Sequence, residues 1–255
     1  MSEYKEVFKR TEVKYLLSKE QFDKLFPELE KIAKIDKYGK TRINNIYYDT
    51  PNYELIRTSL EKPMYKEKLR LRTYGETKDD TNSFIEIKKK YDGIVYKRRI
   101  SAPYRKSFNY LLHGGEAIDN SQISKEIAAL CRRYPGLQPA MTICYDRIAM
   151  AGIEDPDFRV TFDTNIRWNT DVLDLREIPE GTPILNDGEY MMEIKVASAM
   201  PLSLSKVLSE LEIFPASFSK YGRGYTMMIC EKAANMVSRQ TAARSLEKGV
   251  IAYAD

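Results

Sequence analysis

Charged and apolar residues alternate along several segments of this chain with the two-residue period of a β-strand. In residues 84–100, FIEIKKKYDGIVYKRRI, Glu86 and Lys88 fall on one face of a strand and two isoleucines fall on the other. Asp92 and Gly93 then supply a tight turn, because both residue types tolerate a positive φ. The segment therefore predicts a β-hairpin with an apolar face and a cationic face.

The same charged face recurs in other segments, and this recurrence is the strongest signal in the sequence. The residues that share a face, two positions apart, are Arg10, Glu12 and Lys14; Lys66, Lys68, Arg70 and Arg72; Tyr145 and Arg147; Arg159, Thr161 and Asp163; and Glu193 and Lys195. One such strand is typical of a solvated sheet face, but so many are not expected by chance. Because like charges on neighbouring strands repel, the pattern predicts an anionic ligand between them.

Helical patterns accompany these strands. Ser18 and Gln21 have the spacing of a capping box, and an apolar stripe follows them. Strands are predicted at 5–17, 41–49, 65–74, 84–90, 94–102, 140–150, 158–167 and 189–196, and helices at 18–29, 51–60, 107–112, 124–134, 201–211 and 217–230. The predicted fold class is α+β, a closed antiparallel β-barrel or tunnel of about eight strands with a charged lumen and helices packed outside. We expect one domain over residues 1–230 and a helical tail over 231–255.

The direction of the charged face decides the chemistry. If it points outward, the sheet is an ordinary solvated one; if it points inward, the tunnel is a site for a polyanion. Arginine forks match phosphate geometry, and the candidates are Arg70, Arg72, Arg147 and Arg159. Carboxylates are hard oxygen ligands that suit Mg²⁺ or Mn²⁺, and the candidates are Glu12, Glu86 and Glu193.

Composition narrows the function classes. The chain has 255 residues, 31% of them charged and 43% hydrophobic, and its formal net charge is only +4. That balance argues against a globally basic nucleic-acid binder, so the positive charge must be concentrated to matter. Cys131, Cys144 and Cys230 lack the spacing of metal ligands and the even count of a disulfide framework. With no secretory h-region and no apolar run of about 18 residues, the prediction is a cytoplasmic protein.

The chain carries an ordered set of short motifs, namely ExK (Glu12, Lys14), YYDT (Tyr47 to Thr50), LRLR (Arg70, Arg72), EIK (Glu86, Lys88), YDR (Tyr145, Arg147), RVTFDT (Arg159, Asp163), MEIK (Glu193, Lys195) and FSK (Lys220). This set resembles the polyphosphate polymerase domain of the vacuolar transporter chaperone (VTC) family, within the triphosphate tunnel metalloenzymes. None of the motifs is specific alone, but their order and spacing over roughly residues 5–230 are.

The resemblance implies transfer of the ATP γ-phosphoryl group to a growing polyphosphate chain, with Mn²⁺ or Mg²⁺ as cofactor. It implies a set of substrate-binding residues, namely Lys14, Arg70, Arg72, Lys88, Arg98, Tyr145, Arg147, Arg159, Lys195 and Lys220. Of these, Lys88, Arg147 and Lys220 are expected to act on the transferred group. Glu193 is expected to hold the metal, with Glu12 and Glu86 as further ligands. Placing Arg98 rather than Lys97 in the tunnel depends on a count from the hairpin turn.

Two alternatives to polyphosphate synthesis stay open. One is a triphosphatase of the same fold, acting on inorganic or nucleoside triphosphates, and the other is a non-catalytic polyanion-binding module. Arg10 stands where the wider superfamily often has the first acid of ExExK, which weakens the case for a second metal and for simple hydrolysis. The expected partners are ATP and polyphosphate and no nucleic acid. A separate membrane-protein partner is compatible with the sequence.

Overall fold

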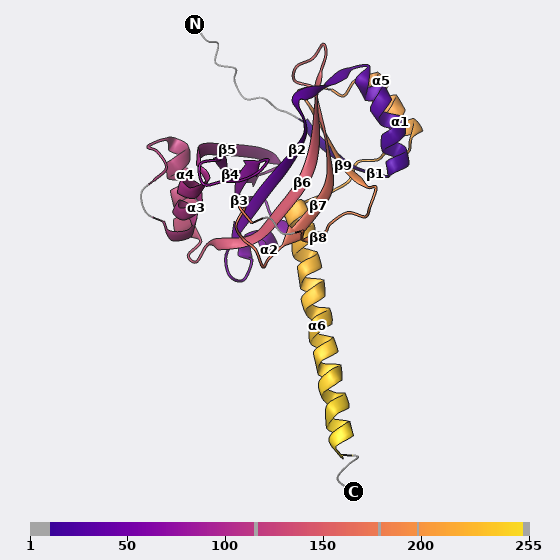
Figure 1. Cartoon of the computed structure of the whole chain (residues 1–255). Coiled ribbons are helices and arrows are strands. Elements are labelled where there is room, and N and C mark those ends of the chain that lie inside the picture. The colour runs from indigo at the N-terminus through magenta and orange to yellow at the C-terminus, as the bar shows by residue number, and fades with distance from the viewer. Residues whose placement is uncertain (1–10, 115–116, 178–179, 198, 252–255) are drawn as a thin grey trace.

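An antiparallel sheet forms the centre of the protein (Figure 1). The computed structural model describes residues 11–114, 117–177, 180–197 and 199–251, and for 239–251 it describes the backbone alone. The strands are β1 (Thr11–Leu17), β2 (Ala33–Asp49), β3 (Tyr65–Tyr74), β4 (Asn82–Tyr91), β5 (Ile94–Pro103), β6 (Gln138–Gly152), β7 (Arg159–Asn169), β8 (Thr182–Pro183) and β9 (Tyr190–Val196). They lie in the order β1-β9-β7-β6-β2-β3-β4-β5, and β8 pairs with β7.

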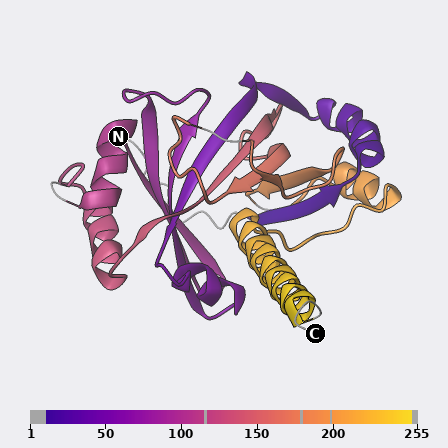
Figure 2. The ribbon, with the colours of Figure 1, turned by 60° about the horizontal axis from the view of Figure 1, so that its bottom comes forward.

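Two pairs of helices lie at opposite ends of this sheet, and a long helix projects away from it (Figures 1 and 2). The helices are α1 (Lys19–Glu30), α2 (Glu54–Leu60), α3 (Tyr104–His113), α4 (Gln122–Arg133), α5 (Leu202–Glu210) and α6 (Lys220–Ile251). The capping box at Ser18 and Gln21 is confirmed at the start of α1. Among the described helices, none combines the length and the apolar character that crossing a membrane requires.

The predicted α+β fold with a large antiparallel sheet is confirmed. The sheet curls, but its end strands β1 and β5 form no ladder with each other among the described residues, so backbone hydrogen bonds do not close it. Side chains approach across the opening instead, where Lys88 Nζ on β4 lies 4.0 Å from Glu12 Oε1 on β1.

Apolar side chains on the outer face of the sheet explain where the helices sit. Under α1 and α5 lie Tyr15, Leu17, Val160, Phe162, Met192 and Ile194. Under α3 and α4 lie Leu69, Leu71, Ile85 and Ile87. These are the residues that alternate with the charged positions, so covering them with helices leaves the charged positions facing inward.

One end of the interior is apolar rather than charged. Met141, Ile143, Ile166 and Trp168 of β6 and β7 pack there against Ile56 of α2, against Phe218 just before α6, and against Tyr221 and Met228 in the first turns of α6. We call this set the inner plug. Figure 2 shows the first turns of α6 between the two halves of the sheet. On the side of β6 and β7, the charged interior therefore ends where α6 begins.

Asp49 ties the inner plug together. Its buried carboxylate accepts hydrogen bonds from the amides of Leu55 and Ile56 in the first turn of α2, at 2.8 and 3.0 Å. It also accepts a hydrogen bond of 2.8 Å from the Tyr221 hydroxyl of α6. The YYDT motif thus fixes two helices to the end of β2, because one carboxylate satisfies orphan amides of the first and the hydroxyl of the second.

The first half of β2 departs from the prediction. A strand is predicted only from residue 41, whereas β2 begins at Ala33 and pairs with β6 along much of its length. Residues 36–40 (DKYGK) are polar or solvent-exposed on both faces, so no alternation marks them as a strand. Gly39 has a φ of 57° there, and the register shifts between Ile35 and Lys40.

Candidate functional site

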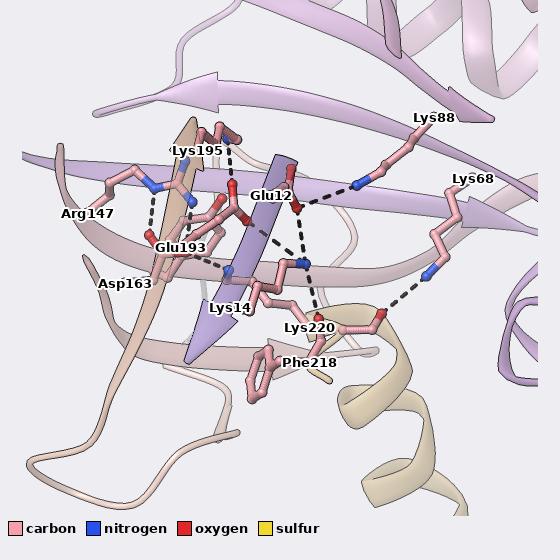
Figure 3. Close-up of polar contacts among 12 residues, drawn as sticks. Glu12, Lys14, Lys68, Lys88, Arg147, Asp163, Glu193, Lys195, Phe218 and Lys220 are labelled. Atoms are coloured by element: carbon pink, nitrogen blue, oxygen red, sulfur yellow. Dashed lines mark hydrogen bonds and ion pairs between the residues drawn. The ribbon is translucent and has the colours of Figure 1, made fainter. Parts of the chain in front are cut away.

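The charged faces of the strands converge inside the curled sheet (Figure 3). Strand register places Glu12 opposite Lys195 and Lys14 opposite Glu193. Contacts also reach the start of α6: Lys14 Nζ donates to the Phe218 carbonyl at 3.2 Å, and Lys68 Nζ of β3 donates to Ser219 Oγ at 3.1 Å. Residues from both ends of the chain therefore surround one polar interior.

Asp163 holds two of the predicted cations in place. Its carboxylate accepts hydrogen bonds from Arg147 Nε at 2.5 Å and Nη2 at 2.8 Å, and from Lys220 Nζ at 2.5 Å. Burial by itself would raise the pKa of Asp163, but Lys220 and Arg147 outweigh burial and lower it. Lys220 also lies 4.5 Å from the centre of the Tyr145 ring, which supplies a cation–π contact.

Glu193 forms a second charged cluster on the β1–β9 wall. Lys195 Nζ lies 2.5 Å from Glu193 Oε1, and Lys14 Nζ lies 3.9 Å from Oε2. Burial opposes ionisation of Glu193, but Lys195, Lys14 and Arg147 hold its pKa well below the usual range. Glu12 reaches the same cluster, 3.5 Å from Lys14. The Glu193 carboxylate is therefore charged at neutral pH.

Glu86 organises the opposite wall. Arg70 Nε donates to Glu86 Oε2 at 2.7 Å, Arg72 Nε lies 3.7 Å from the same oxygen, and Lys97 Nζ lies 2.8 Å from Oε1. Burial opposes ionisation, but these cations keep the pKa of Glu86 well below its usual range. Arg70 also donates to the Tyr47 hydroxyl at 3.1 Å. The arginines are thus oriented by a buried carboxylate before any ligand binds.

The placement of Arg98 in the tunnel is wrong. Arg98 pairs with Ile87 on the outer face of the β4–β5 hairpin and is exposed to solvent, whereas Lys97 pairs with Lys88 on the inner face. The reason is the two-residue turn at Asp92 and Gly93, which fixes the register and so gives every odd position of β5 from Val95 to Arg99 the inner face.

The other predicted residues divide between the interior and its rim. Tyr145 is buried, and its hydroxyl accepts a hydrogen bond of 3.2 Å from Arg72 Nη2. Arg159, the first residue of β7, is exposed and pairs with Lys195 of β9. Lys88 keeps 46% of its side chain exposed. Arg10 lies outside the described residues.

Four residues that the predicted site set omits belong to this interior, namely Lys68, Lys97, Asp163 and Ser219. The alternation of charged positions along the strands already includes Lys68 and Asp163, whereas the count from the hairpin turn selects Arg98 in place of Lys97. Ser219 caps α6, since its Oγ accepts a hydrogen bond of 3.1 Å from the Gly222 amide. Its contact with Lys68 joins residues 151 positions apart in sequence, which no local pattern reveals.

The three candidate metal ligands fit a divalent cation unequally. Glu86 has one oxygen on Arg70 and the other on Lys97, which suits a carboxylate that positions cations. Glu12 and Glu193 stand on neighbouring strands beside the shared Lys14, and Glu12 keeps 33% of its side chain exposed. These two fit a hard cation that is also bound by ligand phosphates. Among the described residues, no group of three or more candidate ligands is assembled.

The motif order and this geometry agree with a comparison against known families. Residues 9–229 match the VTC domain over most of the chain. The chain belongs to the VTC domain family. The curled sheet with its inward charged face is accordingly a triphosphate tunnel fold, and the resemblance seen in the motifs is confirmed. Comparison with curated proteins gives no match.

Solved structures resemble this chain at low sequence identity. A candidate adenylate cyclase from Bacillus halodurans is 15% identical, with a TM-score of 0.51 over 82% of this chain and 92% of that one. A candidate adenylyl cyclase from Hippeastrum, described as having a dominant triphosphatase activity, is 13% identical, with a TM-score of 0.49 over 84% of this chain and 94% of that one. At such identities the likeness concerns the fold.

Proposed function

We propose that this VTC domain synthesises polyphosphate by transferring the γ-phosphoryl group of ATP to the end of a phosphate chain. The observation that carries the proposal is the convergence of cations from two walls on one interior. Arg147, Lys220, Lys14 and Lys195 line one wall, and Arg70, Arg72, Lys68, Lys88 and Lys97 line the other. A linear polyanion between the walls neutralises both.

The proposed step needs little covalent chemistry from the protein. The bond between Pγ and its bridging oxygen breaks, ADP leaves, and an oxygen of the chain's terminal phosphate forms the new bond to Pγ. Because that oxygen is already anionic, no general base is required, and catalysis consists of alignment and charge neutralisation. Arg147, Lys220 and Lys88 are the proposed contacts to the transferred group. They supply fixed positive charge where the equatorial oxygens develop negative charge.

Glu193 and Glu12 are the proposed holders of Mn²⁺ or Mg²⁺. When bound, the metal would neutralise phosphate oxygens alongside the cationic side chains. Glu86 and Asp163 have a different role in this proposal, since each is engaged by several cations and orients them. The buried carboxylates thus preorganise the arginines and lysines for the ligand.

A triphosphatase is the second candidate, and the inner plug favours it. Polymer synthesis needs room for the nascent chain as well as for ATP, whereas hydrolysis needs one opening and a positioned water. The start of α6 fills one end of the interior with apolar side chains. A route for the chain past α6 is therefore a requirement of the polymerase proposal.

Incubation of the protein with ATP and Mn²⁺ separates the two candidates. We expect long polyphosphate on a gel, and ADP formed in proportion to the phosphate units incorporated. Free phosphate with no polymer would establish the triphosphatase instead. ATP left intact, with tripolyphosphate bound, would establish a binding module.

A further inference from the structure

Two lysine pairs face each other directly at one end of the β3–β4 ladder. The register sets Lys68 opposite Lys88 and Lys66 opposite Lys90. All four lie on the same sheet face as Arg70, because residues two positions apart on a strand share a face. Directly opposed like charges destabilise a sheet, so an anion bound between them would remove a repulsion that the free protein retains.

Carboxylates do not neutralise these pairs as they neutralise the rest of the site. In the described part of the chain, Lys66, Lys68 and Lys90 lie within ion-pair distance of no acidic side chain, and Lys88 only reaches Glu12 at 4.0 Å. Lys66 Nζ donates instead to the Ser59 carbonyl at 2.9 Å. Burial lowers the pKa of Lys66, and Lys90, Lys62 and Lys88 lower it further. These ammonium groups are the least compensated cations of the interior.

The two lysine pairs follow one another along β3 and β4, in the direction away from the central site. Lys68 contacts Ser219 at the N-terminus of α6, and Lys66, the next position on that face, contacts Ser59 of α2. Successive positions on one strand face are about 7 Å apart. The inner plug is built mainly on β6 and β7 and on the helices. The lysines therefore extend the charged interior along β3 and β4, past the start of α6, to the end of the β3–β4 ladder at Lys66 and Lys90.

We propose that Lys66 and Lys90, continuing from Lys68 and Lys88, form a binding track for a phosphate chain longer than triphosphate. The inference rests on the proposed function and deepens it, because it assigns the route by which a polyphosphate leaves beside α6. The ligand class is a linear polyanion with more units than the central site can hold.

Chain-length dependence of binding tests this track. We would measure the affinities of tripolyphosphate and of long-chain polyphosphate for the full chain and for a Lys66→Gln/Lys90→Gln double variant. We expect the double variant to bind the long chain at least about tenfold more weakly and tripolyphosphate as the parent does. The slope of log affinity for the long chain against log salt concentration should fall by about two, one for each lost contact.

Lys89→Gln is the matched control, since Lys89 lies on the same strand but on the outer face, 3.1 Å from Glu126. It should leave both affinities unchanged. The melting temperature of the double variant should stay level or rise, because a repulsion is removed. Equal weakening of both ligands, or of neither, would overturn the track, as would RNA binding as tightly as polyphosphate. Failure of the parent to bind tripolyphosphate would instead overturn the proposed function.

Discussion

At the scale of single residues, each buried carboxylate of the site holds several cations. Asp163 is fully buried between Arg147 and Lys220, and Glu86 is 2% exposed between Arg70 and Lys97. Removing one partner of a buried ion pair leaves the other charge uncompensated in a medium of low dielectric. The acids and the cations of this interior therefore depend on one another for stability as well as for geometry.

Asp163→Asn tests this dependence. The amide keeps the shape but leaves Arg147 and Lys220 without their counter-charge, so we expect the free energy of unfolding to fall by about 3 kcal/mol in urea titrations. Asp23→Asn is the control. Its carboxylate pairs with Lys19 on the exposed surface at 2.7 Å, and loss of such a pair should cost less than about 1 kcal/mol. Equal effects of the two substitutions would show that Asp163 does not stabilise the interior through Arg147 and Lys220.

Glu193→Gln and Glu86→Gln separate a metal ligand from a positioning residue. We expect Glu193→Gln to weaken Mn²⁺ binding strongly in calorimetric titrations with a non-hydrolysable triphosphate present, because the amide lacks the charge that a hard cation needs. Glu86→Gln should leave Mn²⁺ affinity near that of the parent but lower stability, since Arg70 and Lys97 lose their counter-ion. If Glu86→Gln weakened Mn²⁺ binding and Glu193→Gln did not, Glu86 would be the metal ligand and Glu193 the positioning residue.

Two lysines of the site should give a characteristic pH dependence. Burial lowers the pKa of Lys68 and of Lys97 to about 8, whereas an unfolded lysine titrates near about 10.4. Between these values the unfolded state binds more protons, so the free energy of unfolding should rise with pH. Tripolyphosphate affinity should fall over the same range, because binding needs protonated ammonium groups. In the Lys68→Gln variant, tripolyphosphate affinity should fall less steeply with pH. A parent affinity that does not change with pH would contradict the role given to these two lysines.

At the scale of secondary-structure elements, the start of α6 belongs to the site. Ser219 caps the helix and contacts Lys68, and Lys220 reaches Asp163. The hydrogen bond from Tyr221 to Asp49 fixes this turn to the end of β2. Helix N-termini carry partial positive charge and favour phosphate. The first turn of α6 thus adds both a full and a partial charge where the polar interior meets the inner plug.

Lys220→Ala should reduce polyphosphate elongation more than it reduces release of phosphate from ATP. In the proposed polymerase, the nascent chain must stay aligned with the transferred γ-phosphoryl group while the next ATP binds, and Lys220, as a proposed contact to that group, would help to hold this alignment. Both products are measured in one reaction. Lys232→Ala, an exposed cation farther along the same helix, should change neither. Equal loss of both activities would make Lys220 a general substrate contact.

At the scale of the whole molecule, the ligand is expected to bridge the gap between the two ends of the sheet, which backbone hydrogen bonds do not close. Cations stand on both sides of the gap between the sheet ends, with Lys14 on β1 and Lys88 on β4, and Glu12 lies within ion-pair distance of both. A triphosphate long enough to contact both walls replaces that weak bridge with several charge-assisted contacts. We therefore expect ligand binding to draw the two ends of the sheet together.

Tripolyphosphate should raise the melting temperature by roughly 5 to 10 °C at a concentration of about one hundred times its Kd. Hydrogen exchange should slow at the amides of β1 and β5, because both edge strands are drawn toward the ligand. Orthophosphate is the control, since it is too short to span the walls. The same protection with orthophosphate would show that bridging does not matter.

The sequence by itself determined the elements and the inner face of most strands. Its two-residue alternation identified the strands that carry Lys14, Arg70, Arg147 and Glu193, because a half-buried strand must separate apolar from polar positions. The count from the hairpin turn placed Arg98 inside instead of Lys97, because a one-residue slip in register moves a side chain to the other face of the strand. The polar start of β2 left no such pattern, so its length was not predictable.

Only the tertiary structure decided which charges meet. Lys220 donates a hydrogen bond to Asp163, 57 positions away in sequence, and Lys68 donates one to Ser219, 151 positions away. Such contacts depend on how far the sheet curls and on where α6 enters it, which follow from packing over the whole chain. The same holds for the inner plug and for the unclosed edges β1 and β5. Periodicity assigns a residue to a face, but only the closure of that face in space gives it a partner.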